Sequence, residues 1–171
     1  PRESTAPDFV EIKDRKKSYL LVDGYNIIFA WEELSELAKL NLDSARVLLM
    51  DILSNYQGYK GMNLILVFDA YRVKGGQRKI ERYHNIYVVY TEEAETADKY
   101  IEKTVHDMDK KHDVTVATSD GLEQIIVFGE GAARLSAREL YEEVMKASDD
   151  MRRNFLEKRT RLWNTVIKEQ G

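Results

Sequence analysis

The sequence predicts an α/β fold, a three-layer sandwich around a mostly parallel central sheet. Short runs of aliphatic and β-branched residues fall at 18–23, 63–68, 86–90 and 113–117. Apolar residues in the intervening segments recur at three- and four-residue spacings, as they do in amphipathic helices. Buried strands that alternate with helices are typical of a parallel sheet covered on both faces.

The ends of the predicted strands indicate where function lies. A parallel sheet brings the C-terminal ends of its strands to one edge, and open α/β sheets bind ligands there. Three of the apolar runs lead directly into acidic residues, which are Asp23, Asp69 and, after Thr118-Ser119, Asp120. The sequence therefore predicts carboxylates gathered at the functional edge of the sheet.

The segments around these strands can be assigned in order. After the strand at 18–23 we expect a helical region from Ile27 to Leu37 and a second helix over 43–58, which Gly58 and Gly61 end. Gly75-Gly76 predicts a turn in the loop after the strand at 63–68. The remaining elements are a helix over 95–111, a short helix over 120–128 and a brief strand at 133–135.

The C-terminal part predicts one long helix. Ser136 and Glu139 have the spacing of a capping box, in which each side chain satisfies a backbone amide of the first turn. An apolar stripe continues from Leu140 to Val166, and Ser148-Asp149-Asp150 is a candidate break in it.

Composition limits the class of protein. A length of 171 residues favours one domain, 18–171, preceded by a polar linker or arm at 1–17 that holds both prolines. The absence of cysteine excludes disulfides and thiolate metal sites, and no apolar run is long enough to span a membrane. The simplest interpretation is a cytoplasmic protein without a membrane partner. A start at Pro1 is compatible with a piece of a longer chain.

Charge is distributed unevenly although the net value is only −4. One basic group lies at 72–84 and a second at 151–168, and each can be either a solvated face or a surface for nucleic acid. In the first group, Arg72, Lys74, Arg78 and Lys79 are candidate phosphate contacts, and Tyr71 is a candidate for base stacking.

The predicted helix over 95–111 adds a further acid to the cluster. Asp98 falls within its apolar stripe of Ala94, Ala97, Ile101, Val105 and Met108, and Glu95 lies one turn earlier. Two carboxylates ~5 Å apart at an effective dielectric constant of ~20 repel by roughly 3 kcal/mol. A divalent cation would remove this cost, and oxygen ligands without cysteine favour Mg²⁺ or Mn²⁺.

Each acid also has a purely structural alternative. Asp23 before Gly24 can form a turn, and Asp69 can hydrogen-bond its own loop. Asp120 can cap the following helix with Glu123, and Glu95 can be a first-turn acid favoured by the helix dipole.

Five segments together resemble the YacP-type NYN domain, a branch of the PIN-like nucleases, over about residues 18–160. They are Asp23-Gly24-Tyr25-Asn26, Phe68 to Gly76, Glu95-Thr96-Ala97-Asp98, Thr118-Ser119-Asp120 and Arg134 to Leu140. The resemblance implies a PIN-like fold with Rossmann-like topology and a metal-dependent endoribonuclease. It implies metal ligation by Asp23, Asp98 and Asp120, with support from Asn26, Asp69, Glu95 and Ser119.

The resemblance also implies partners and a setting. Relatives of this type act on translated mRNA at the ribosome of bacteria, and similar domains are fused to translational GTPases. We therefore expect cleavage of single-stranded RNA, with Mg²⁺ or Mn²⁺ as cofactor. A binding module that docks RNA or a ribosome without cutting is the alternative. A haloacid-dehalogenase-type phosphatase is disfavoured, because Tyr25 stands where that class has a second acid.

Overall fold

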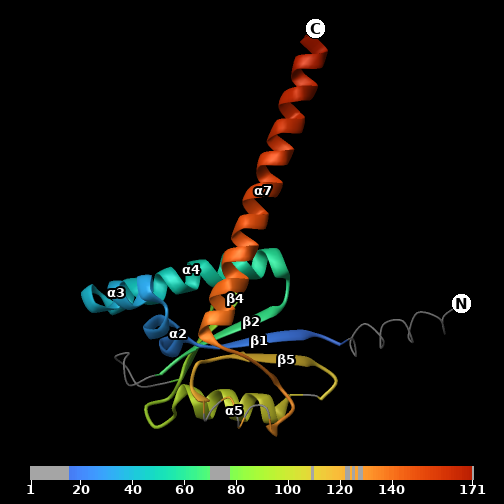
Figure 1. Ribbon diagram of the computed structural model, residues 1–171. Helices are drawn as coiled ribbons and strands as arrows, with labels where there is room; N and C mark the ends of the chain where they lie inside the picture. Colours follow the sequence, from blue (N-terminus) through green and yellow to red (C-terminus); the bar gives the residue numbers. More distant parts are fainter. Residues whose placement is uncertain are drawn as a thin grey trace, which may run out of the picture.

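A six-stranded sheet between two layers of helices forms the body of the protein (Figure 1). The computed structural model describes residues 16–69, 78–108, 110–121, 124, 126 and 129–170. The strand order is β3-β4-β2-β1-β5-β6, and all neighbours are parallel except β3 and β4. The strands are β1 (Ser18–Asp23), β2 (Asn63–Phe68), β3 (Lys79–Tyr83), β4 (Ile86–Tyr90), β5 (Asp113–Ala117) and β6 (Ala133–Leu135). The predicted mostly parallel sheet is confirmed.

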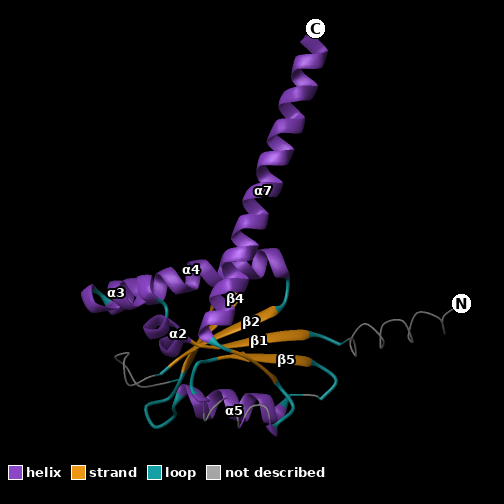
Figure 2. Ribbon diagram, viewed as in Figure 1, coloured by secondary structure: helices purple, strands orange, loops and turns teal. Residues whose placement is uncertain are grey.

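The helices cover the two faces of the sheet unequally (Figure 2). They are α2 (Gly24–Ala30), α3 (Glu32–Leu40), α4 (Leu42–Lys60), α5 (Ala97–Asp107) and α7 (Ala137–Gln170). The first three and the beginning of α7 lie on one face, whereas α5 lies on the other. Among the described residues, no helix combines the length and the apolar character needed to cross a lipid bilayer.

Alternation along the central strands accounts for two separate cores. Successive residues of a strand point to opposite faces. Leu20 and Val22 accordingly pack against α2, α4 and α7, whereas Leu21 packs against Ile101 and Val105 of α5. Because both faces are covered, β1 is apolar at consecutive positions, which is the pattern that the sequence displays.

The strand register brings the predicted acids to the same edge. Val22 of β1 lies opposite Ala117 of β5, and Asp23 lies opposite Val67 of β2. The residue after Ala117 therefore lies beside Asp23, and Asp69 follows two positions after Val67. The C-terminal ends of β1, β2 and β5 thus form one continuous edge, as predicted.

Two elements differ from the expectation. Strand β3 was not predicted, because its residues lack the continuous apolar run that identifies the central strands; it pairs with β4 alone, as an antiparallel edge strand. Helix α5 begins at Ala97 instead of residue 95, with Thr96 as its N-cap, so Ala94 is exposed and lies outside the helix. Asp98 is consequently the second residue of α5, half-buried in its first turn.

Helix α7 begins as predicted and runs without interruption through Ser148-Asp149-Asp150. The Ser136 amide donates to Glu139 Oε1 at 3.0 Å, and the Glu139 amide donates to Ser136 Oγ at 3.1 Å, which confirms the capping box. Beyond about residue 150 the helix extends away from the body (Figure 1). The predicted stripe is therefore buried only in its first half.

Candidate active site

Asp23 and Asp120 are connected through one buried side chain, that of Thr118. Asp23 ends β1 and is only 5% exposed. Thr118 is fully buried just after β5; its Oγ1 donates to Asp23 Oδ2 across 3.4 Å and accepts from the Asp120 amide at 3.1 Å. One hydroxyl therefore orients a buried carboxylate and the backbone that carries a second acid.

Asn26 holds the adjoining part of the same loop. Its Oδ1 accepts a hydrogen bond from the Ser119 amide at 2.6 Å, from a position on the first turn of α2. Ser119 in turn accepts at Oγ from the Ala137 amide at 3.0 Å, at the start of α7. Asn26 and Ser119 thus link α2, the loop after β5 and α7, and this tie positions Asp120.

Gly24 explains how the chain can turn directly after Asp23. A Cβ at this position would lie 2.9 Å from the carbonyl oxygen of Val67 and would also collide with the Phe68 ring. Only glycine lets α2 start this close to β2, so that Asn26 reaches the sheet edge. Gly24 thus allows α2 to begin directly after Asp23, at the edge of the sheet.

Asp69 supports the helix that carries Asp98. Its Oδ1 accepts from the Ala97 amide at 2.5 Å, and Thr96 Oγ1 accepts from the Lys99 amide at 3.2 Å. Both bonds satisfy amides that the first turn of a helix leaves without partners. The half-buried Asp98 side chain is thereby placed at the N-terminal end of α5, at the same edge of the sheet as Asp69.

Glu95 forms an ion pair with Arg78, the residue directly before the edge strand β3. Arg78 Nη2 donates to Glu95 Oε1 at 2.6 Å and to Oε2 at 2.8 Å. This bond raises the pKa of the Arg78 guanidinium. The fully buried Thr91 donates from Oγ1 to the Glu95 carbonyl at 2.7 Å and fixes the loop. Glu95 is therefore an ion-pair partner in this arrangement.

The structure describes only part of the predicted basic surface. Lys79 is exposed on β3 and pairs with Glu81 at 3.2 Å, near the Arg78–Glu95 pair. Tyr71, Arg72 and Lys74 lie outside the described residues, and so does Glu123, the expected partner of Asp120 in a capping box. Only Arg78 and Lys79 of the predicted RNA contacts can therefore be placed beside the acidic edge.

The metal centre stays a prediction. Among the residues that the structure describes, no three His, Cys, Asp or Glu side chains are grouped so that they could hold a metal ion. Asp23 has Thr118 as a hydrogen-bond partner and Asp69 has the Ala97 amide, so part of the acidic edge serves to orient the backbone.

Comparisons with known proteins decide the family. The YacP-like NYN domain family matches residues 20–170, nearly the whole chain. The chain belongs to this family. Membership points to a nuclease-type domain with an RNA-related function, and the resemblance found in the sequence motifs is confirmed.

Relatives of this NYN domain extend the comparison to solved structures. The protein named Uncharacterized protein YacP of Bacillus subtilis (strain 168) is 46% identical over 126 residues, which cover 73% of this chain and 74% of the relative. A crystal structure of Rae1 (YacP) from Bacillus subtilis matches with a TM-score of 0.72 and 39% identity, over 89% of this chain and 88% of that one. A crystal structure of a tryptophan-to-leucine mutant of Rae1 (YacP) gives a TM-score of 0.73 and 38% identity, over 84% of each chain.

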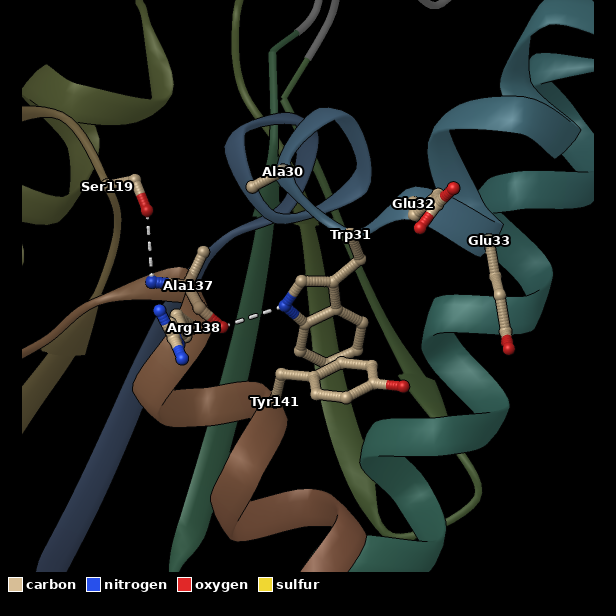
Figure 3. A pocket seen from close by; sticks show the side chains of 8 residues that line it. All are labelled: Ala30, Trp31, Glu32, Glu33, Ser119, Ala137, Arg138 and Tyr141. Atoms are coloured by element: carbon tan, nitrogen blue, oxygen red, sulfur yellow. Dashed lines mark hydrogen bonds between the residues drawn. The ribbon is translucent and has the colours of Figure 1, made fainter.

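A cleft of about 570 Å³ adjoins the acidic edge of the NYN domain (Figure 3). Trp31 and Tyr141 form its centre, with ring centroids 5.3 Å apart in an edge-to-face arrangement. Trp31 Nε1 donates to the Ala137 carbonyl at 2.8 Å, which fixes the indole. No motif in the sequence points to this cleft, because Trp31 belongs to the apolar stripe of the predicted helical region and Arg138 lies between the two residues of a capping box. Thr118 was likewise missed as a connecting residue.

Proposed function

We propose that this NYN domain is an endoribonuclease that cleaves single-stranded RNA with the help of Mg²⁺ or Mn²⁺. The observation that carries the proposal is the network in which Thr118 joins Asp23 to the backbone of Asp120, while Asn26 fixes Ser119 between them. Such a network holds acids in place at the edge where α/β folds perform chemistry. Membership of the NYN family supports the same reaction class.

The donor chemistry fits an ion that shares its ligands with the substrate. The site offers carboxylate and hydroxyl oxygens, which suit Mg²⁺ or Mn²⁺ better than Zn²⁺. Mg²⁺ usually binds one or two carboxylates together with waters and substrate phosphates, so a closed protein cage of three acids is not required. Asp23, Asp98 and Asp120 would hold the ion, which supplies a polarised phosphate and a bound water of lowered pKa.

The other residues of the site act on the substrate and on the loops. Asn26 keeps the Ser119 loop in place, and Asp69 does the same for the start of α5. Arg78, directly before β3, and Lys79, its first residue, offer positive charge to phosphates that flank the cleavage point. The proposal gives Arg72 and Lys74 the same role, and it gives Tyr71 the role of stacking a base. Since phosphate contacts release counterions, RNA binding should weaken steeply as salt rises.

The setting of the reaction is a finer part of the proposal. We expect the substrate to be mRNA during translation, in the cytoplasm, with the ribosome as a partner. The family resemblance supports this, and a parent chain that carries a translational GTPase would place the domain beside the ribosome directly. Cleavage should therefore be assayed both on free RNA and on translating ribosomes.

Two variants on α5, each with one acid changed to its amide, test the catalytic assignment. Asp98→Asn should abolish cleavage in Mg²⁺ or Mn²⁺, and Asp107→Asn should keep it, because Asp107 lies exposed at the far end of the same helix. Thermal unfolding and circular dichroism should show that both variants stay folded. Equal cleavage by the wild type and Asp98→Asn, on free or ribosome-bound RNA, would remove Asp98 from the mechanism.

A second candidate function is a module that binds RNA without cutting it. The observation in its favour is that Asp69 and Glu95 make bonds within the protein and that the described acids form no metal-binding group. Metal titration separates the two functions. A catalytic site gains about 2.7 kcal/mol of stability when Mn²⁺ reaches 100 times its Kd. This gain should vanish in Asp23→Asn, whereas a binding module would show none in either protein.

A further inference from the structure

We infer that the cleft around Trp31 and Tyr141 binds the base of a guanine nucleotide adjoining the cleavage point. This inference rests on the proposed function, because it gives that site a base preference. Four elements form the cleft: the junction of α2 and α3, the start of α3, the loop after β5 and the first turns of α7. Its volume of about 570 Å³ lies in the range of pockets that hold small ligands.

The two ends of the cleft differ in charge (Figure 3). Ser119 and Arg138 lie on one side of the aromatic pair, and Glu32 and Glu33 lie on the other. Ser119 directly precedes Asp120, so the Arg138 end is the one next to the proposed reaction centre. The Arg138 side chain is 88% exposed and pairs with the exposed Glu142 at 3.4 Å, a weak surface contact from which it can turn to a phosphate. A nucleotide can thus lie across the aromatic centre with its phosphate toward the acidic edge.

The aromatic and acidic residues favour one class of base. Tyr141 is 38% exposed and rests on the fixed indole of Trp31, which gives a base a supported ring to stack on. Proteins read unstacked RNA bases by such stacking and by hydrogen bonds to the Watson–Crick edge. Guanine presents two adjacent N–H donors on that edge, which match a carboxylate such as that of Glu32 or Glu33. Uracil presents a single donor there.

Binding of mononucleotides in EDTA tests the cleft without any cleavage. Trp163→Phe leaves Trp31 as the only tryptophan, so its fluorescence reports on the cleft. We expect GMP to bind more tightly than AMP, CMP or UMP. Tyr141→Ala should weaken GMP binding at least ten-fold, and Glu32→Gln with Glu33→Gln should abolish the preference for GMP. Glu36→Gln is the matched control, because Glu36 lies on α3 outside the cleft.

The outcomes separate the cleft from the nuclease. GMP binding without RNA cleavage would support the nucleotide-binding cleft and contradict the proposed nuclease activity. RNA cleavage with equal binding of all four nucleotides would contradict the guanine preference of the cleft alone. No saturable response to GMP up to about 10 mM, or a response insensitive to Tyr141→Ala, would overturn the inference.

A separate observation concerns the projecting half of α7 (Figure 1). Its large apolar side chains are exposed to solvent: Phe155, Leu156, Leu162, Trp163, Val166 and Ile167. Phe155, Leu162 and Trp163 are each between 64% and 68% exposed. Phe155, Leu162 and Val166 recur at spacings of seven and four, so they share one side of the helix. That side carries an apolar surface without a partner among the described residues.

We propose that this surface pairs with a second copy of the chain, in which two α7 helices lie antiparallel. Residues 137–150 hold five Asp or Glu and two Lys or Arg, a net charge of −3. Residues 151–170 hold six Lys or Arg and two Glu, a net charge of +4. An antiparallel pair about a two-fold axis places the acidic half of each helix beside the basic half of the other. A parallel pair would place like charges together.

A groove on the body is in position to receive the partner's helix. It lies between α4 and the first half of α7, holds about 310 Å³ and is lined mainly by Ile52, Tyr56, Val144 and Met145. Val144 lies eleven residues before Phe155, so it shares the side of α7 that carries the exposed stripe. The side of α7 that carries the exposed stripe would therefore face the same side of the partner's α7. A single interface would then bury the exposed apolar residues of both copies.

The mass in solution tests the pairing. Light scattering or sedimentation equilibrium should give twice the 19.9 kDa of one chain at micromolar concentrations. Leu162→Glu should yield monomer, and Asn164→Glu, which adds the same charge on the polar side, should leave the dimer intact. A wild-type protein that stays at 19.9 kDa at about 100 μM would overturn the proposal, even if the apolar stripe then bound anionic vesicles or RNA.

Charge reversal tests the antiparallel arrangement. Arg152→Glu with Arg159→Glu should weaken the dimer at least ten-fold, and so should Glu142→Lys with Asp149→Lys. A mixture of the two variants should restore a heterodimer, because both contacts become complementary again. A parallel pair predicts instead that each variant dimerises as the wild type does, so that result would overturn the arrangement.

Discussion

The hydroxyl of Thr118 donates a hydrogen bond to the carboxylate of Asp23 across 3.4 Å, although 95 residues separate them in the chain. The pairing of Val22 with Ala117 brings these residues together at the ends of β1 and β5. Because the same oxygen accepts from the Asp120 amide, the hydroxyl serves as donor and acceptor at once. No purely apolar side chain of similar shape can fill this role.

Thr118→Val should therefore lower both stability and activity. The change keeps the shape but removes one hydrogen bond from the buried Asp23 carboxylate and one from the Asp120 amide. The loss of hydrogen bonds of this kind, one of them to a charged group, costs about 1–3 kcal/mol. Urea unfolding of the variant should show a loss in this range, and cleavage should fall more than stability explains. Thr118→Ser keeps the hydroxyl and should recover most of both, whereas a valine variant as stable and active as the wild type would contradict this account.

Gly24→Ala should destabilise the fold through a steric collision. The new methyl group would meet the Val67 carbonyl at 2.9 Å and the Phe68 ring. Neither neighbour can retreat, because Val67 and Phe68 are both fully buried in the central strand β2. Overpacking of this kind typically costs about 1–3 kcal/mol. Thermal unfolding should show it, and Gly121→Ala, where the new atom meets nothing within 4 Å, is the matched control.

The sequence predicts the central sheet well because its strands are buried on both faces. A short continuous apolar run such as Leu20-Leu21-Val22, bounded by turn signals, is typical of a buried strand. Strand β3 escapes the same reasoning, since an edge strand that pairs only with β4 has no need of an apolar run. Its Ile80 is exposed, and Arg82 and Lys79 give it the charge expected of a loop.

The site is predictable in its acids but not in its hydrogen bonds. The positions of Asp23 and Asp69 follow from where strands end, which a pattern can reveal. The bonds from Thr118 to Asp23 and from the Ala97 amide to Asp69 depend on the strand register and on the exact start of α5. Sequence periodicity predicts the strand register and the first residue of a helix only to within one or two residues. A shift of one residue changes which side chain faces the site.

Arg78→Ala should affect RNA binding far more than stability. Its ion pair with Glu95 is partly exposed, and pairs of this kind contribute about 0–1 kcal/mol. If Arg78 contacts a phosphate, its loss should weaken binding of all single-stranded sequences alike and reduce the salt slope by about 1. Filter binding over a range of salt measures this. Lys103→Ala, on the exposed side of α5, is the control, and equal salt slopes for all three proteins would exclude Arg78 from the RNA surface.

Glu139→Gln should remove a pH-dependent part of the stability. Hydrogen bonds from the Ser136 amide and hydroxyl lower the pKa of the Glu139 carboxyl below its ordinary value. The unfolded chain therefore binds a proton at a higher pH than the folded one does, so this contribution is complete above the ordinary glutamate pKa and is lost as pH falls toward the lowered pKa. Unfolding curves of wild type and Glu139→Gln should differ at pH 7 and converge at acidic pH. Glu142→Gln, one turn later and outside the box, should shift the curve by less, and a Glu139→Gln difference that stays constant or grows toward acidic pH would contradict the sign of this linkage.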